Sequence, residues 1–273
     1  MSQIEYIDYK QLPKDHRGQI RIYDQEAFSA MHRAGQLAAQ CLDELADKVR
    51  PGLTTLEIDK FVFEFAIKNS ALPATLNYRG YKYSCCTSIN HVICHGMPEE
   101  RRLKPGDIIN IDVTFIVNGW HGDSSRMYPV GEIKPAARRL LNITHECLMH
   151  AIEIIKPGIT TGDIGHVIQR HAEANRCSVV RDFCGHGIGQ LFHDWPNIMH
   201  YGSPASGIEL KAGMIFTIEP MINLGAAPAK ILADGWTAVT RDKSLSAQYE
   251  HMIGITATGC EIFTLSPKKI FYL

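Results

Sequence analysis

The chain has 273 residues, with 28 Lys and Arg against 29 Asp and Glu, 45% hydrophobic residues and 21% charged residues. This composition is typical of a globular protein that buries a large core as one domain or two small ones. The net charge of -1 argues against a general nucleic-acid or membrane-surface binder, and no apolar run approaches the roughly 20 residues that span a bilayer.

The chain begins with a polar stretch. Residues 1–24, which include Pro13 and Gly18, are expected to form an arm on the surface, followed by one domain over residues 25–273. The start, MSQIEYIDYK, lacks the apolar region of a secretory signal. Eight scattered cysteines without a C-x-x-C pair favour reduced, mostly buried thiols. Both features predict a cytoplasmic protein.

Two helices are expected next. Apolar residues at steps of three and four predict a helix over about 25–49, which Pro51-Gly52 ends. Thr54 or Thr55 can cap a second helix that runs to about Asn69. Short strand-like runs follow, over residues 85–89, 107–116 and 125–130.

The second half of the chain repeats this order. Residues 50–70, RPGLTTLEIDKFVFEFAIKNS, resemble residues 156–176, KPGITTGDIGHVIQRHAEANR. LKPGDIINID (103–112) likewise aligns with LKAGMIFTIE (210–219) at nearly the same spacing. The alternative is convergent helix-start chemistry, because P-G-x-T-T is a generic stop-and-cap sequence. We predict duplicated halves, about 25–135 and 136–265, with the site in a cleft where they meet.

The aligned segments each end in an acid after an apolar strand, Asp112 in IINID and Glu219 in IFTIE. A carboxylate in such a place is costly unless an ion pair or a metal neutralises it. Two carboxylates at equivalent points of two halves would converge on the pseudo-symmetry axis. This geometry would suit a shared cation.

Asn118-Gly119 is a strong hairpin signal between two of these strands. A two-residue turn would pair Asp112 with Ser125 and make Asp123 a diagonal neighbour of Asp112 on the same face. Two buried carboxylates so placed repel each other, and a divalent cation between them makes the net electrostatic interaction attractive. The alternative is a pair of solvated turn aspartates.

Histidines and one more acid complete the candidate set. His186 lies in the glycine-rich segment CGHGIG, and both His95 and His193 begin an H-x-x-P sequence. Glu250, in AQYEH, precedes a mostly apolar run, although a single acid there is more often solvated. Four carboxylates and one imidazole are too carboxylate-rich for a structural zinc and suit two adjacent divalent ions. These candidate ligands are Asp112, Asp123, His186, Glu219 and Glu250.

Six segments occur in a family order: CHGMP, INIDVT, WHGDSSRMYPVG, CGHGIG, FTIEPM and SAQYEH. With them, the chain over about residues 25–265 resembles the type I methionine aminopeptidases in their short bacterial form. The resemblance implies an α+β pita-bread fold, with pseudo-two-fold duplicated halves around a central antiparallel sheet. The chain lacks the long insertion before Glu250 that type II relatives carry and the zinc-binding extension of eukaryotic cytosolic relatives.

The resemblance also implies roles for single residues. Asp112 matches a ligand of one metal, His186 and Glu219 match ligands of the other, and Asp123 and Glu250 match the bridging ligands. His95 and His193 match active-site histidines that bind substrate and assist catalysis, and Glu219 matches the general base. The residues that match the methionine pocket, for which core packing is the alternative, are Tyr78, Tyr81, Cys86, Phe192 and Trp236. Thr75 is a departure, because bacterial relatives often carry Cys there.

The implied activity is metal-dependent removal of the initiator methionine from nascent proteins and peptides with a small second residue. A hydroxide that bridges two divalent cations (Co, Mn, Fe or Zn) would attack the first peptide carbonyl. The implied partners are peptides with an N-terminal Met and nascent chains near the ribosome. No membrane and no specific nucleic acid is expected as a partner, and a monomer is expected.

Three alternatives compete with this interpretation. A proline aminopeptidase or prolidase shares the fold but usually carries an additional N-terminal domain, for which the arm of residues 1–24 is too short. A metal-free relative could act as a binding module on ribosomes or nucleic acid, although such relatives typically lose ligands. The acids could also form ordinary ion pairs in an unrelated α/β protein.

Overall fold

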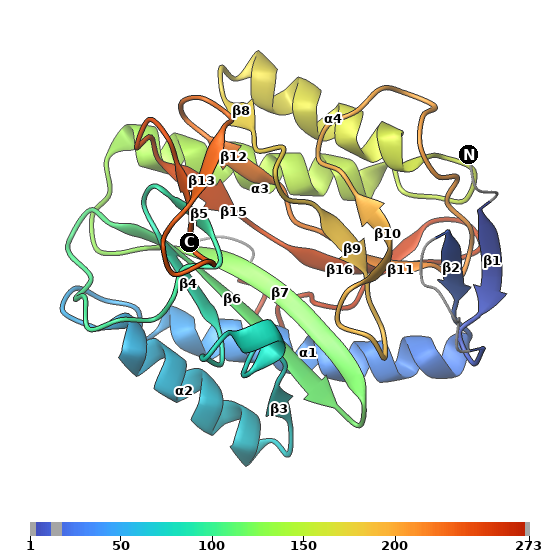
Figure 1. The fold of residues 1–273 in the computed structure, drawn as a ribbon, viewed down its shortest axis with the longest axis horizontal. Coiled ribbons are helices and arrows are strands. Elements are labelled where there is room, and N and C mark those ends of the chain that lie inside the picture. Colours follow the sequence, from blue (N-terminus) through green and yellow to red (C-terminus); the bar gives the residue numbers. More distant parts are fainter. Residues whose placement is uncertain (1–3, 12–17, 271–273) are drawn as a thin grey trace.

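Helices flank the strands in two pairs on opposite sides of the molecule (Figure 1). Helices α1 (Gln25–Ala46) and α2 (Thr55–Lys68) lie along one side, and α3 (Pro135–Glu153) and α4 (Thr161–Ala174) along the other. The strands lie between the two pairs, so the predicted α+β class is confirmed. None of the helices in the described part of the chain is long and apolar enough to cross a membrane.

The computed structural model describes residues 4–11 and 18–270. In the first half of the chain, one sheet combines β3 (Leu72–Pro73), β4 (Cys86–Ile89), β6 (Ile108–Val117) and β7 (Trp120–Pro129). In the second half, a five-stranded sheet combines β10 (Asp194–Ile198), β9 (Gly185–Gly187), β11 (Ile215–Ile218), β16 (His251–Ile255) and β17 (Cys260–Ile262).

Shorter antiparallel sheets connect these two. One orders β15 (Ser246–Gln248), β12 (Met221–Asn223) and β8 (Ser178–Val179). The other orders β13 (Ala229–Ile231), β14 (Ala238–Thr240) and β5 (Val92–Cys94), and therefore joins strands of both halves. A short 3-10 turn, η1 (Tyr78–Gly80), precedes β4.

The predicted helices and strands occur with small changes at their ends. The first helix stops at Ala46 rather than near residue 49. The second begins with a capping box, in which the Thr54 hydroxyl accepts from the Glu57 N–H while the Glu57 carboxylate accepts from the Thr54 N–H. The strand expected over 125–130 is longer than predicted, because it pairs from the turn onward along β6.

The β6–β7 hairpin has the register that the Asn118-Gly119 turn predicts. Val117 pairs with Trp120 and Asp112 with Ser125. Asp123 lies directly opposite Thr114, two residues beyond Asp112 on the same strand face. The two aspartates are therefore diagonal neighbours, as expected.

Equivalent contacts occur in the two halves. The Gly52 N–H donates to the Leu103 carbonyl at 2.8 Å, and the Gly158 N–H donates to the Leu210 carbonyl at 2.9 Å. Helix α4 repeats the capping box of α2, with Thr160 and Asp163 in place of Thr54 and Glu57. The two largest apolar clusters are centred one on each half, around Leu42 and Phe115 and around Leu148 and Phe216, although Ile108 of the first half belongs to the second cluster.

The described part of the N-terminal arm is more ordered than its composition suggested. β1 (Glu5–Asp8) and β2 (Gln19–Ile22) pair in parallel, and Ile20 is buried. β2 lies against β10, and the Arg21 Nε is 2.7 Å from the Asp194 carboxylate in a buried ion pair. Part of the predicted arm, residues 1–3 and 12–17 with Pro13, falls outside the described residues.

The backbone of helix α1 packs directly against the backbone of β7 in the hairpin. A Cβ on Gly122 would overlap the Ala34 carbonyl and lie 2.7 Å from the Gly35 nitrogen. We expect Gly122→Ala to cost the upper end of about 1–3 kcal/mol, since both elements are rigid. For a chain of this size, this corresponds to a melting temperature lower by roughly 6–10 °C in a thermal unfolding scan.

Gly259→Ala is the matched control for this variant. A Cβ on Gly259 would meet only the Ile155 carbonyl oxygen, at 3.9 Å, which is ordinary van der Waals distance. We expect it to leave the melting temperature unchanged. Equal melting temperatures for both variants would contradict the close approach of α1 to β7.

Candidate active site

A cavity of about 310 Å³ lies where the two halves meet. It gathers every site residue that the sequence singled out: Tyr78, Tyr81, Cys86, His95, Asp112, Asp123, His186, Phe192, His193, Glu219, Trp236 and Glu250. These residues come from segments more than 170 positions apart. The predicted location of the site between the halves agrees with this arrangement.

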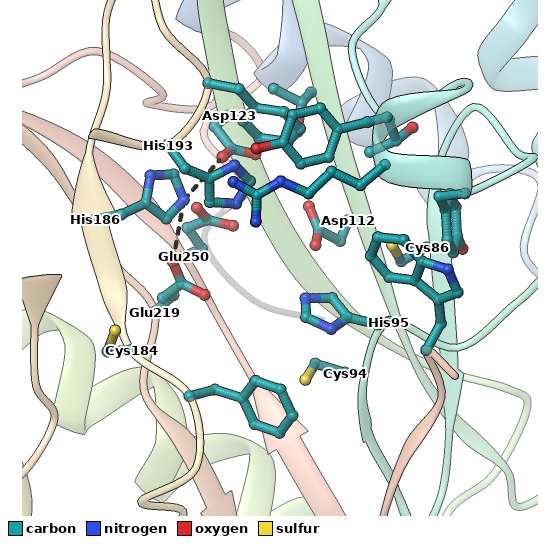
Figure 2. A pocket seen from close by; sticks show the side chains of 18 of the residues that line it. Cys86, Cys94, His95, Asp112, Asp123, Cys184, His186, His193, Glu219 and Glu250 are labelled. Atoms are coloured by element: carbon teal, nitrogen blue, oxygen red, sulfur yellow. Dashed lines mark hydrogen bonds and ion pairs between the residues drawn. The ribbon is translucent and has the colours of Figure 1, made fainter. Parts of the chain in front are cut away.

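The five ligand-type side chains point into a common space (Figure 2). Asp112 and Asp123 come from β6 and β7, His186 from β9, Glu219 from the end of β11, and Glu250 from the junction of β15 and β16. The His186 Nε2 lies 3.6 Å from the Asp123 carboxylate and 3.7 Å from the Glu219 carboxylate. One donor atom each of Asp123, His186 and Glu250 lies within 4.8 Å of the other two. Asp112 lines the same space from the side of Cys86.

Neighbouring polar side chains orient these carboxylates. The Thr114 hydroxyl donates to Asp123 at 2.6 Å, and the Thr217 hydroxyl donates to Glu219 at 2.8 Å. Thr217 also accepts from the His186 N–H at 3.0 Å, which joins two of the ligand-type residues. The Gln248 amide donates to the other Glu219 oxygen at 3.1 Å.

Sequence reasoning missed Thr114, Thr217 and Gln248. Thr114 could have been found from the sequence, because the hairpin that the Asn118-Gly119 turn predicts places it directly opposite Asp123. Thr217 lies on β11 two residues before Glu219, which directly follows the strand, so the two side chains extend to the same side. Gln248 has no comparable signal, because its contact with Glu219 spans two different strands.

Burial raises the free energy of the charged forms of these four acids, because they lose contact with water. It raises the pKa of Asp123 to about 7 and raises the pKa values of Asp112, Glu219 and Glu250 well above their ordinary range. The charge of Asp123 adds to the rise in the pKa values of Asp112, Glu219 and Glu250. Burial also lowers the pKa of His186 to about 4, so its ring is neutral and can offer a lone pair.

A divalent metal fits this donor set. Among the ion pairs of the described residues, none brings a Lys or Arg to any of the four carboxylates. Asp123 and Glu250 are only 4% and 3% exposed, so water does little to compensate their charge. Oxygen donors with one neutral imidazole are ligands for hard and borderline divalent cations.

Two further histidines line the cavity outside this cluster. His95 follows β5 with a left-handed φ of 55°, a conformation that costs energy for a non-glycine residue and is common at functional sites. His193 precedes β10, and the centre of its ring lies 4.2 Å from the centre of the His186 ring. Burial, with His186 and Arg79 nearby, lowers the pKa of His193 to about 2, so the ring is neutral.

Aromatic side chains and a thiol form the rest of the wall. The centres of the Tyr78 and Phe192 rings lie 4.9 Å apart. The centres of the Tyr81 and Trp236 rings lie 5.1 Å apart, with an angle of 72° between the ring planes. Cys86 pairs with Asp112 across β4 and β6, and burial raises the pKa of its thiol. The wall is therefore apolar and polarisable beside the carboxylates.

Other side chains complete the lining. Thr75, the departure noted in the sequence, is buried, and its hydroxyl donates to the Tyr83 carbonyl at 3.0 Å. Lining residues that the sequence did not single out include Arg79, Cys94, Asp182, Phe183, Cys184 and Met221.

Comparisons with known proteins agree with this geometry. Residues 29–257 match the model of metallopeptidase family M24. The chain is 52% identical to the methionine aminopeptidase of Rickettsia prowazekii over 93% of this chain and 98% of the relative. It is 48% identical to that of Escherichia coli K12, over 90% of this chain and 94% of the relative.

Solved structures show the same likeness. The crystal structure of the Rickettsia prowazekii enzyme covers 90% of this chain and 100% of its own, with a TM-score of 0.89 and 51% identity. A prolidase from Pyrococcus furiosus is 21% identical, with a TM-score of 0.71 over 89% of this chain and 65% of its own, and so shares the fold alone. The predicted pita-bread fold is confirmed.

The family model implies divalent-metal use, which the donor set in the cavity fits. In the described chain, only strands and turns lie between His186 and Glu250, as in the predicted short form. The high identity extends over nearly the full length of the bacterial relatives. The chain therefore belongs to metallopeptidase family M24 and, within it, to the methionine aminopeptidases.

Proposed function

We propose that the protein removes the initiator methionine from nascent proteins and peptides that carry a small second residue. The observation that carries this proposal is one cavity that joins an acid-rich ligand cluster to an aromatic and thiol wall. An unbranched thioether fits such a wall, because sulfur makes favourable contacts with aromatic rings. The names of the bacterial relatives support the same substrate.

The ligand assignment is part of the proposal. Two divalent cations per chain (Co, Mn, Fe or Zn) would be held with Asp112 on one ion, His186 and Glu219 on the other, and Asp123 and Glu250 between them. When bound, the cations supply a nucleophile from water near neutral pH and polarise the peptide carbonyl. The four positive charges of two such ions would offset the four negative charges of the carboxylates, as a buried site requires.

The chain's own groups would then orient the substrate and move protons. Glu219 accepts the proton of the attacking water as general base, and the Thr217 and Gln248 contacts hold its carboxylate in position. His193, which is neutral, donates a hydrogen bond to the oxygen of the first peptide carbonyl. His95 binds the nitrogen of the scissile bond, which would depart as the amine with the proton that Glu219 relays from the water.

The methionine side chain would lie against the wall of Tyr78, Tyr81, Cys86, Phe192 and Trp236. The Tyr81 ring packs edge-to-face on the Trp236 ring, and the centre of the His95 ring lies 6.1 Å from that of Trp236, so we expect a narrow apolar space for the methionine side chain here. A β-branched side chain fits such a space less well than an unbranched one. Thr75, where bacterial relatives often carry Cys, also lines this cavity and would belong to the outer wall of the pocket.

Peptide cleavage with each metal restored to stripped enzyme tests the activity. We expect Met-Ala-Ser to be cleaved after Met and Ala-Pro peptides to be left intact. Cleavage should fall as the second residue grows along a Met-x-Ser series. Preferential cleavage of Ala-Pro would instead assign the chain to the proline-specific relatives.

His193→Ala tests the assignment of the oxyanion donor. We expect kcat for Met-Ala-Ser to fall about 10²–10³-fold while the metal content stays unchanged. His91→Ala is the control, because His91 lies outside this cavity, and it should leave kcat unchanged. Loss of metal from His193→Ala would make His193 a ligand and overturn the assignment.

We further propose that the protein acts as a monomer in the cytoplasm, on chains emerging from the ribosome, without binding a membrane or a specific nucleic acid. Its eight cysteines are free thiols, and six of them are buried. Thiols in this state suit a reducing compartment.

A further inference from the structure

The cavity carries one cationic side chain that the proposed reaction does not use. Among its described lining residues, Arg79 is the sole Lys or Arg. Its backbone has a φ of 49°, in a turn where Asn77 and Gly80 also have positive φ. The side chain is exposed while it lines the cavity, so it lies at the mouth.

Stacked rings connect Arg79 to the predicted oxyanion donor. The Arg79 guanidinium carbon lies 5.1 Å from the centre of the Tyr78 ring. The Tyr78 ring is in turn stacked on the His193 ring, with centres 5.2 Å apart and planes 21° apart. The guanidinium is therefore at most roughly 10 Å from the group that would face the scissile carbonyl.

This distance corresponds to a particular part of a bound peptide. An extended chain advances about 3.3–3.6 Å per residue. With the first carbonyl at His193, roughly 10 Å covers the second and third residues. The second residue is small in the proposed substrates, so the side chain within reach of Arg79 belongs to the third.

The opposite charge lies on another wall of the cavity. Asp182 is exposed, lines the cavity and precedes Phe183, whose ring packs edge-on against His95 at 5.4 Å. The mouth is thus positive beside Tyr78 and His193 and negative near His95. A peptide that leaves along the Tyr78 side meets the guanidinium rather than the carboxylate.

We propose that Arg79 is a specificity-determining residue that makes the enzyme favour substrates with Asp or Glu at the third position. This inference rests on the proposed function. The guanidinium pairs with a carboxylate in a planar, bidentate geometry, and the Tyr78 ring limits its rotamers beforehand. Because the pair is near solvent, its contribution is modest and decreases with salt.

Three peptide amides test this proposal: Met-Ala-Asp-Gly-NH₂, Met-Ala-Asn-Gly-NH₂ and Met-Ala-Lys-Gly-NH₂. The amide removes the terminal carboxylate, which could otherwise pair with Arg79. We expect wild-type kcat/KM to be about two- to five-fold higher for the Asp peptide than for the Asn peptide at low salt. The ratio should approach one at 0.5 M NaCl.

Variants of Arg79 assign the preference to this side chain. Arg79→Gln should bring the Asp-to-Asn ratio to one, Arg79→Glu should reverse it in favour of Lys, and Arg79→Lys should keep part of it. Any general effect of a variant on turnover cancels in these ratios. Lys82→Gln is the matched control, because Lys82 is exposed nearby but does not line the cavity, and it should keep the wild-type ratio.

Two failures are distinguishable. If wild-type enzyme does not cleave the neutral Asn peptide, the proposed function itself is wrong. If it cleaves all three peptides at equal kcat/KM, or if Arg79→Gln keeps the wild-type ratio, the role of Arg79 is overturned and the function stands.

Discussion

Asp112→Asn and Glu250→Gln are each expected to reduce turnover of Met-Ala-Ser by about 10³-fold or more. Each variant keeps the shape of the side chain and removes one of the charges that would hold the cations. Bound metal should fall below the two ions per chain expected of the wild type, measured by elemental analysis after dialysis. Because the carboxylates repel one another, the metal-free variants should unfold at or above the temperature of metal-free wild type.

Asp182→Asn is the matched control for these two variants. Asp182 lines the same cavity but is exposed, unlike the five candidate ligands. It should keep the full metal content. If Asp112→Asn keeps the metal content and turnover of the wild type, the two-metal assignment is wrong. If metal-free Asp112→Asn melts at a lower temperature than metal-free wild type, Asp112 has a purely structural role.

Arg21→Met is expected to give the largest loss of stability. The ion pair of Arg21 with Asp194 is 2.7 Å long, and both side chains are only 3% exposed. Removing one partner of a buried ion pair is strongly destabilising, by about 3–5 kcal/mol, because the remaining charge stays buried and loses the attraction of its partner. Denaturant unfolding followed by circular dichroism measures this loss. Since Asp194 directly follows His193, kcat should also fall.

A second ion pair in the same arm provides the control. Lys10 and Asp24 are 2.9 Å apart but 59% and 45% exposed, so Lys10→Met should leave stability unchanged. The double variant Arg21→Met with Asp194→Leu should recover most of the lost stability, because no charge is left buried. If the double variant is as unstable as Arg21→Met, lost packing rather than charge explains the effect.

Much of the site follows from local sequence rules. The Asn118-Gly119 turn fixes the strand register, and the register alone makes Asp112 and Asp123 diagonal neighbours. Repeated stop-and-cap sequences predict the duplicated helices, and Thr54 caps α2 as expected, with Thr160 in the same place on α4. Local rules succeed here because turn geometry and capping depend on residues that are close in the chain.

The contacts that local rules could not predict are long-range. The pairing of β1 with β2 and the ion pair of Arg21 with Asp194 depend on how the arm lies against β10. The arm's polar composition hides the buried Ile20, since only a few of its residues face the core. Arg79 was missed for another reason, because its left-handed backbone carries no signal in a non-glycine residue.

Glu250, the last proposed ligand in the chain, is hydrogen-bonded to β7 of the first half, and this has a consequence for biosynthesis. Glu250 is fixed by hydrogen bonds from its N–H to the Ser125 carbonyl at 3.1 Å and from the Ser124 hydroxyl to its carbonyl at 2.8 Å. Asp112 and Asp123 thus leave the ribosome long before the strand that completes their cluster. A chain whose translation has not yet passed Glu250 lacks one of the proposed ligands, so the cluster can form only after residues of both halves have been made.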